Sequence, residues 1–161
     1  MPLLAKYPSP VILNHIGETM TISNQSNQQK ATKFTVPGMD ELSAKRAIAT
    51  LDNRMVALLD LALTLKHIHW NVVGPNFIGV HEMLDPQVEA VGDMTDTIAE
   101  RIATLGGTPL GTPQSISDRR TWNDYSLGKA LVMEHLGALD LVYSGVNSDH
   151  RKAMIEMGEL D

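Results

Sequence analysis

The sequence predicts an all-α fold in which long amphipathic helices pack on one another. Hydrophobic residues make up 43% of the 161 residues but aromatic residues only 4%, so we expect an aliphatic, methionine-rich core. Apolar side chains recur at alternating three- and four-residue steps, which is the period of an α-helix. The length is that of one domain large enough to bury such a core.

The folded part is expected to begin after a polar N-terminal segment. Residues 1–35 include the low-complexity run SNQSNQQK, which predicts a flexible tail, and residues 36–161 then form the helical domain. Pro37 and Gly38 mark the boundary. The tail carries a net charge of +2 and the remainder −8, so the folded part attracts cations and repels nucleic acid.

The first helix is expected to run from Asp40, a favourable N-cap residue, to Trp70. Val72, Val73, Gly74 and Pro75 then end it. One face of this helix forms a continuous stripe, which consists of Leu51, Met55, Leu58, Ala62, Leu65 and His69.

The second helix is expected to be capped by Asn76 and to extend to Leu105, before a pair of glycines. Pro86 lies inside this stretch and is expected to kink the helix or to reset its N-terminus. Residues 106–122 are rich in Gly, Pro and Thr and predict a loop with room for one short turn.

The third helix is expected from about Asp124 to Met157, with one apolar side formed by Leu131, Leu139, Val142 and Val146. The chain ends soon afterwards, at Asp161. The prediction is therefore three long helices, one fewer than a four-helix bundle requires.

Metal-binding side chains recur at helical spacing in the middle of the chain. They are His69, His81, Asp85, Asp96 and Glu100. His81 and Asp85 are four residues apart, as are Asp96 and Glu100, so each pair projects from one side of a helix. Two imidazoles and three carboxylates suit a borderline divalent metal such as iron better than a soft metal.

The spacing also limits where a metal ion can be bound. Asp85 and Asp96 are eleven residues apart, which is ~16 Å along a helix axis, whereas metal–ligand bonds are only ~2 Å long. Either each pair forms a half-site with too few ligands, or a second copy of the helix runs antiparallel alongside. A two-fold pair of chains would then hold two complete sites. The spacing favours the second arrangement, a site between subunits.

The stretches Lys66–Trp70, Gly74–Asp85 and Asp96–Arg101 together resemble the Dps family, the small dodecameric ferritins of bacteria, and the similarity covers roughly residues 40–157. The resemblance implies a ferritin-like four-helix bundle with a short helix in the long loop, although the fourth long helix is not evident in this chain. It implies a cytoplasmic homo-oligomer of twelve chains, in some members associated with the nucleoid. It also implies a ferroxidase that oxidises ferrous iron, preferably with hydrogen peroxide, and stores the ferric mineral.

The resemblance assigns roles to single residues. It places the ligands His69, His81 and Asp85 on one subunit, Asp96 and Glu100 on its two-fold mate, and Trp70 beside the iron as an acceptor of stray radical equivalents. Further hypotheses are that Glu89 or Asp93 seeds mineral and that Asp149 lines an acidic pore. Some family members bind DNA through a tail with many lysines. In this chain the candidate DNA-binding residues of the tail are Lys6, Lys30 and Lys33.

Other functions are weighed against this one. The alternative is a DNA-compacting protein with little iron chemistry, in which many weakly basic tails act together. A helical domain that assembles and does no chemistry is a third hypothesis. The HExxH zinc-protease motif is excluded because Asp85 replaces its second histidine, and no Gly-rich phosphate loop is present. No stretch approaches the ~18 apolar residues of a membrane span, and the absence of cysteine excludes thiolate metal sites.

Overall fold

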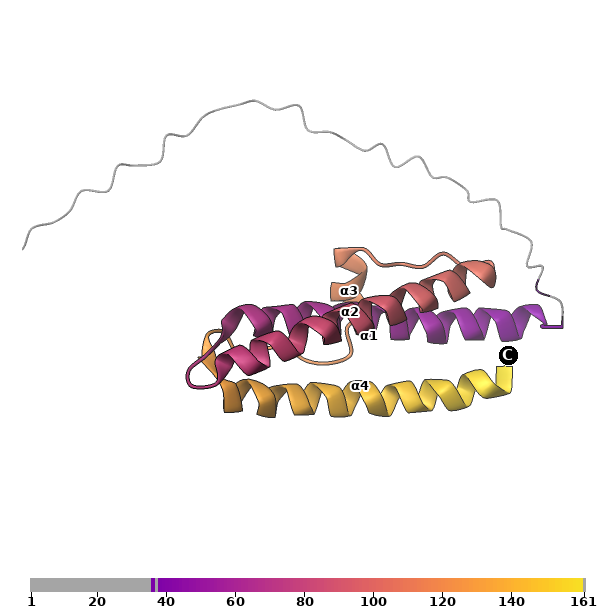
Figure 1. Cartoon of the computed structure of the whole chain (residues 1–161). Helices are drawn as coiled ribbons and strands as arrows, with labels where there is room; N and C mark the ends of the chain where they lie inside the picture. Colours follow the sequence, from indigo (N-terminus) through magenta and orange to yellow (C-terminus); the bar gives the residue numbers. More distant parts are fainter. Residues whose placement is uncertain (1–35, 37, 161) are drawn as a thin grey trace, which may run out of the picture. The chain divides into compact units, whose positions relative to one another are not determined.

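The computed structural model describes residue 36 and residues 38–160. In this part of the chain there are three long helices, one short helix and a two-stranded parallel sheet (Figure 1). In chain order they are α1 (Glu41–Asn71), β1 (Val72–Val73), α2 (Phe77–Thr104), α3 (Pro113–Arg119), β2 (Ala130–Leu131) and α4 (Val132–Leu160). The predicted all-α fold, with a short helix inside the long loop, is confirmed. The predicted tail, with Lys6, Lys30 and Lys33, lies outside the described residues.

The three long helices pack side by side around a shared aliphatic core. α1 runs antiparallel to both α2 and α4 (Figure 1). The core contains Leu58, Leu61, Leu65 and Ile68 of α1, Val80, Leu84 and Val91 of α2, and Leu139 and Val146 of α4. The buried α1 residues continue the stripe expected from the sequence, because both follow the helical period. Among the described residues, no helix is long and apolar enough to cross a membrane.

The start of α1 is as predicted, and the start of α2 differs in detail. The Asp40 side chain accepts hydrogen bonds from the backbone N–H groups of Leu42 and Ser43, at 2.9 and 3.0 Å. Asn76 precedes α2 as expected, but it has φ 65° and its side chain makes no cap hydrogen bond. Asn76 thus occupies the N-cap position, as predicted, but its side chain does not cap the helix and its backbone lies in the left-handed region.

Pro86 does not divide α2. The helix continues through Pro86 from Phe77 to Thr104, so the expectation of a reset N-terminus is wrong. A proline inside a helix removes one backbone donor, and the packing of α2 against α1 outweighs that loss. Asp85, Asp96 and Glu100 consequently lie on a single uninterrupted helix.

The third long helix begins at Val132 and not near Asp124, so the predicted N-terminus is wrong by two turns. Leu131 lies in β2, pairs with Val73 of β1, and is 53% exposed, so it does not belong to the apolar side of the helix. The backbone N–H of Leu131 donates to the Glu134 carboxylate at 2.9 Å, which stabilises the start of α4 at this point.

Candidate metal centre between helices α1 and α2

The turn between α1 and α2 brings His69 and His81 into direct contact. His69 Nδ1 lies 3.0 Å from the carbonyl oxygen of His81, and His81 Nδ1 lies 2.9 Å from the carbonyl oxygen of His69. The two rings are stacked, with centroids 3.6 Å apart and an interplanar angle of 24°. Because a carbonyl oxygen only accepts hydrogen bonds, each Nδ1 carries the proton and donates it. In a neutral imidazole that carries its proton on Nδ1, Nε2 has the lone pair with which histidine binds a metal ion.

Asp85 lies next to this histidine pair, one helical turn beyond His81. Its Oδ1 is 3.3 Å from His69 Nδ1 and 2.7 Å from Lys66 Nζ. The pKa of the Asp85 carboxyl is lowered, mainly because Lys66 donates a hydrogen bond to it, while partial desolvation acts in the opposite direction. Asp85 is thus an ionised carboxylate at neutral pH. His69 is only 9% exposed and Asp85 is 53% exposed, so the group opens to the surface through the carboxylate.

Lys66 is a member of this group that the sequence reasoning did not single out. It is half-buried on α1 and reaches Asp85 of α2. A signal was available, since Lys66 precedes His69 by three residues and therefore lies on the same face of the helix. A cation bound at Asp85 would compete with this ammonium group for the carboxylate.

Asp96 and Glu100 do not join the other three predicted ligands within one chain. Both are exposed on α2, about three (Asp96) and four (Glu100) helical turns beyond Asp85. In residues 38–160, no three His, Asp or Glu side chains are placed to hold one metal ion together. His69, His81 and Asp85 lie next to one another without being placed to hold one metal ion together, and Asp96 and Glu100 form a separate acidic pair.

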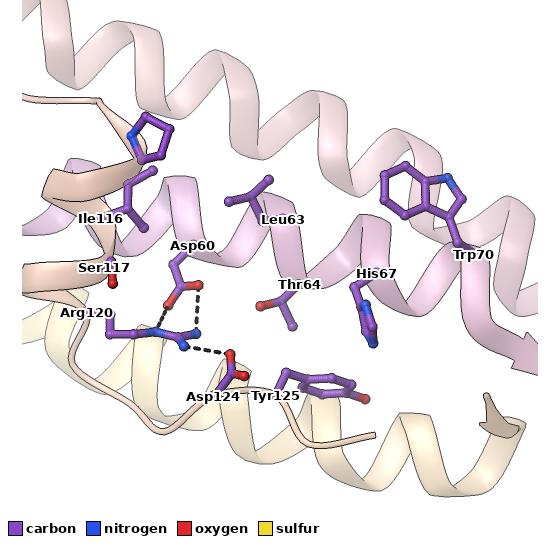
Figure 2. Close-up of a pocket in the computed structure, with 11 residues that line it drawn as sticks. Asp60, Leu63, Thr64, His67, Trp70, Ile116, Ser117, Arg120, Asp124 and Tyr125 are labelled. Carbon is purple, nitrogen blue, oxygen red and sulfur yellow. Dashed lines mark hydrogen bonds and ion pairs between the residues drawn. The ribbon is translucent and has the colours of Figure 1, made fainter. Parts of the chain in front are cut away.

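Trp70 and His67 border a pocket on the outer side of α1 (Figure 2). The pocket has a volume of about 480 Å³ and extends to Arg120 and Tyr125. Trp70 is 72% exposed. His67 is half-buried and donates a hydrogen bond from Nε2 to the Leu127 carbonyl oxygen at 2.7 Å. It therefore fixes the segment between α3 and α4 against α1.

The other acidic residues proposed from the sequence lie apart from this centre. Glu89 and Asp93 are exposed on α2. Asp149, on α4, pairs with Lys152 at 2.9 Å and lies 4.0 Å from Arg54. Its pKa is lowered, mainly by the hydrogen bond from Lys152. Asp149 is thus an ionised group that already has a cationic partner.

The helical arrangement and the position of the centre define the class of protein. Residues 48–159 match the ferritin-like domain, so this is a ferritin-like protein. It is 55% identical over 130 residues to the DNA protection during starvation protein of Mycolicibacterium smegmatis, which covers 81% of this chain and 71% of that relative. The chain belongs to the Dps family.

Solved structures show the same fold. The tetragonal form of Mycobacterium smegmatis Dps superposes with a TM-score of 0.79 at 55% identity, over 81% of this chain and 79% of that one. DpsA14 from Streptomyces coelicolor gives a TM-score of 0.79 at 56% identity, over 81% and 78%.

Proposed function

We propose that this protein is a ferroxidase and iron store. The observation that carries the proposal is the proximity of three potential ligands: His69 and His81 bond reciprocally through Nδ1 to each other's carbonyl oxygens, and Asp85 Oδ1 lies 3.3 Å from His69 Nδ1. Nitrogen and carboxylate donors in this combination suit ferrous iron. Iron is the substrate and the stored product in this scheme, and the acidic composition of residues 36–161 favours its approach.

The proposed site is completed by a second subunit. Since α2 is continuous from Phe77 to Thr104, Asp85 and Asp96 are ~16 Å apart along its axis and do not share an ion. An antiparallel α2 of a two-fold mate would bring its own Asp96 and Glu100 to His69, His81 and Asp85. Each pair of chains then has two sites, and the family relationship supports a shell of twelve chains.

Pairing of electrons is the chemical advantage of such a site. Two ferrous ions are oxidised to ferric ions and supply two electrons to hydrogen peroxide. The peroxide takes up two protons and forms two molecules of water. No hydroxyl radical is released when both electrons arrive together. Removal of ferrous iron and peroxide in one reaction would protect DNA, the role named for the mycobacterial relative.

Glu89 or Asp93 would then seed the ferric mineral and Asp149 would line the route of entering cations.

The proposal predicts that Asp85→Asn slows ferric formation. The amide has nearly the same shape but no charge, so the rate after mixing ferrous protein with peroxide should fall at least roughly tenfold. Stopped-flow absorbance on anaerobically loaded protein measures this. Glu82→Gln is the matched control, since Glu82 is an exposed carboxylate on the same helix, next to His81. Equal rates in Asp85→Asn and the unmodified protein would refute the site.

DNA binding is a second proposed function, because the mycobacterial relative is named for DNA protection. It would depend on Lys6, Lys30 and Lys33, whose effect is multiplied by assembly, and it would be opposed by the charge of −8 on residues 36–161. We expect retardation of duplex DNA in a gel at low salt, lost steeply as salt rises, because phosphate contacts release counterions. Replacing the three lysines by glutamine should abolish the shift. Retardation that persists in this variant would assign binding to another surface.

A further inference from the structure

The side of α4 that points away from the core combines small and apolar residues. α4 lies at the edge of the bundle (Figure 1), and its buried residues are His135, Leu139 and Val146. A residue two positions from a buried one points about 200° away from it. The opposite side, here called the outward face of α4, therefore consists of Gly137, Leu141, Ser144, Ser148 and Ile155. All five are exposed, Leu141 by 75% and Ile155 by 69%.

The contacts of α4 with its neighbours leave the outward face uncovered. Glu156 faces α1, where its carboxylate accepts a hydrogen bond from the Thr50 hydroxyl at 3.0 Å. Tyr143 faces α2, where its hydroxyl donates to the side chain of Gln87. A further helix packed against the core beside α2 would contact the Tyr143 side of α4 and would also leave the outward face exposed. A methyl group added at Gly137 would meet open space among the described residues.

Two opposite charges border the outward face on the same side. Asp140 and Arg151 are both exposed and eleven residues apart, which is ~16 Å along the helix axis and about 20° around it. Among the residues that the structure describes, neither takes part in a salt bridge within the chain. The neighbouring Lys152, by contrast, already pairs with Asp149 at 2.9 Å. Asp140 and Arg151 are therefore available to pair with charges on another molecule.

An antiparallel copy of α4 complements this arrangement. Around a two-fold axis, equal flanks of two antiparallel helices meet, so a register that pairs Asp140 with Arg151 of the copy also pairs Arg151 with Asp140 of the copy. The same register brings Ile155 of the copy within one residue of Gly137, where there is open space. It also places Leu141 of the copy opposite a shallow hollow of about 400 Å³, which is lined by Ser144, Asn147, Ser148, Arg151, Lys152 and Ile155. Charge and shape thus agree on one occupant.

We propose that the outward face of α4 binds the same face of a second copy of this chain, and that this contact links separate assemblies. The inference uses the shell proposed above but not its iron chemistry. The α2 pair already occupies one two-fold axis, and all two-fold axes of a tetrahedral shell of twelve chains are equivalent. An α4 pair therefore joins one shell to another. One helix pair is a small interface, but a shell carries twelve such faces, so several contacts act together.

Sedimentation velocity on the full chain, freed of iron and of nucleic acid, tests this contact at low salt. We expect a species larger than the main assembly, and its share should rise with protein concentration. Asp140→Arg and Arg151→Asp should each lose this species, because like charges then face each other across the contact. The double variant that carries both changes should regain it. Lys45→Asp is the matched control, since it makes the same change of charge at an exposed lysine of α1, and it should keep the larger species.

Mixing the two single variants after each has assembled tests the contact between assemblies directly. Asp140→Arg chains have a positive charge at both positions, and Arg151→Asp chains have a negative charge at both. Assemblies of one variant should therefore bind assemblies of the other, although neither variant associates with itself. If mixing does not restore the larger species, the antiparallel register is wrong.

Other results would overturn the proposal in different ways. The contact is refuted by the absence of a larger species in the unmodified protein, or by a share that is unchanged in both single variants. Loss of the main assembly itself in a single variant would place the outward face inside the shell. Ferric formation after mixing with peroxide separates this proposal from the ferroxidase function. Both residues lie on α4, outside the proposed iron site, so the rate should be that of the unmodified protein whether or not the assemblies associate.

Discussion

Chains carrying Asp85→Asn, mixed and reassembled with chains carrying Glu100→Gln, should show ferroxidase activity well above that of either variant alone. In a two-fold pair, each site takes Asp85 from one chain and Glu100 from the other. A mixed pair therefore has one site with both changes and one site with neither. Random pairing of equal amounts makes half the pairs mixed, so about a quarter of all sites should be intact. Stopped-flow ferric absorbance before and after joint reassembly measures the recovery.

Two controls make the result specific. Each variant reassembled alone must keep its low activity, and Asp85→Asn mixed with His81→Ala must show no recovery. His81 and Asp85 come from the same chain, so no pairing of those two variants produces an intact site. If activity returned in that mixture, or in neither mixture, the site would not be shared between subunits in the proposed way.

The sequence predicted those features that depend on short spacings along the chain. Asp40 was identified as the N-cap of α1 because capping involves only the next few residues. The buried stripe of α1 follows from its period, and the grouping of His81 with Asp85 follows from a separation of four residues on one helix. The prediction that Asp85 and Asp96 lie too far apart to share a metal ion likewise depended only on α2 being continuous, and α2 is continuous in the structure.

The features that the sequence did not predict depend on contacts between distant segments. α4 begins at Val132 because β2 pairs with β1, nearly sixty residues earlier in the chain, and because Arg120 binds Asp124 outside any helix. The reciprocal hydrogen bonds of His69 and His81 depend on how α2 folds back on α1. The contact of Lys66 with Asp85 depends on the same turn. Helical periodicity contains no information on such pairings.

Replacing Arg120 by methionine should destabilise the helical domain by about 3 kcal/mol, because it leaves the buried carboxylate of Asp60 without a counter-ion. Arg120 donates to both Asp60 oxygens, at 2.9 and 3.1 Å, and also binds Asp124 at 2.7 Å (Figure 2). Asp60 is only 5% exposed, whereas Asp124 is exposed and remains solvated after the change. Thermal unfolding followed by circular dichroism measures the loss. Asp124→Asn is the matched control and should change stability by less than about 1 kcal/mol, because a solvent-exposed ion pair contributes little.

The pH dependence of the same variant identifies Asp60 as the cause. In the unmodified protein burial raises the pKa of Asp60, and the charge of Arg120 and its hydrogen bonds partly offset that rise. Without Arg120 the pKa rises further above the value of the unfolded chain, so the folded state binds the proton more tightly than the unfolded state does. Acidification should therefore recover stability: the difference between Arg120→Met and the unmodified protein should shrink as pH falls from 7 through the raised pKa of Asp60. Asp60→Asn removes the titrating group, so the difference between Asp60→Asn combined with Arg120→Met and Asp60→Asn alone should not vary with pH over this range. A deficit of Arg120→Met that stays constant on acidification would mean that lost packing, and not the uncompensated Asp60 charge, destabilises the variant.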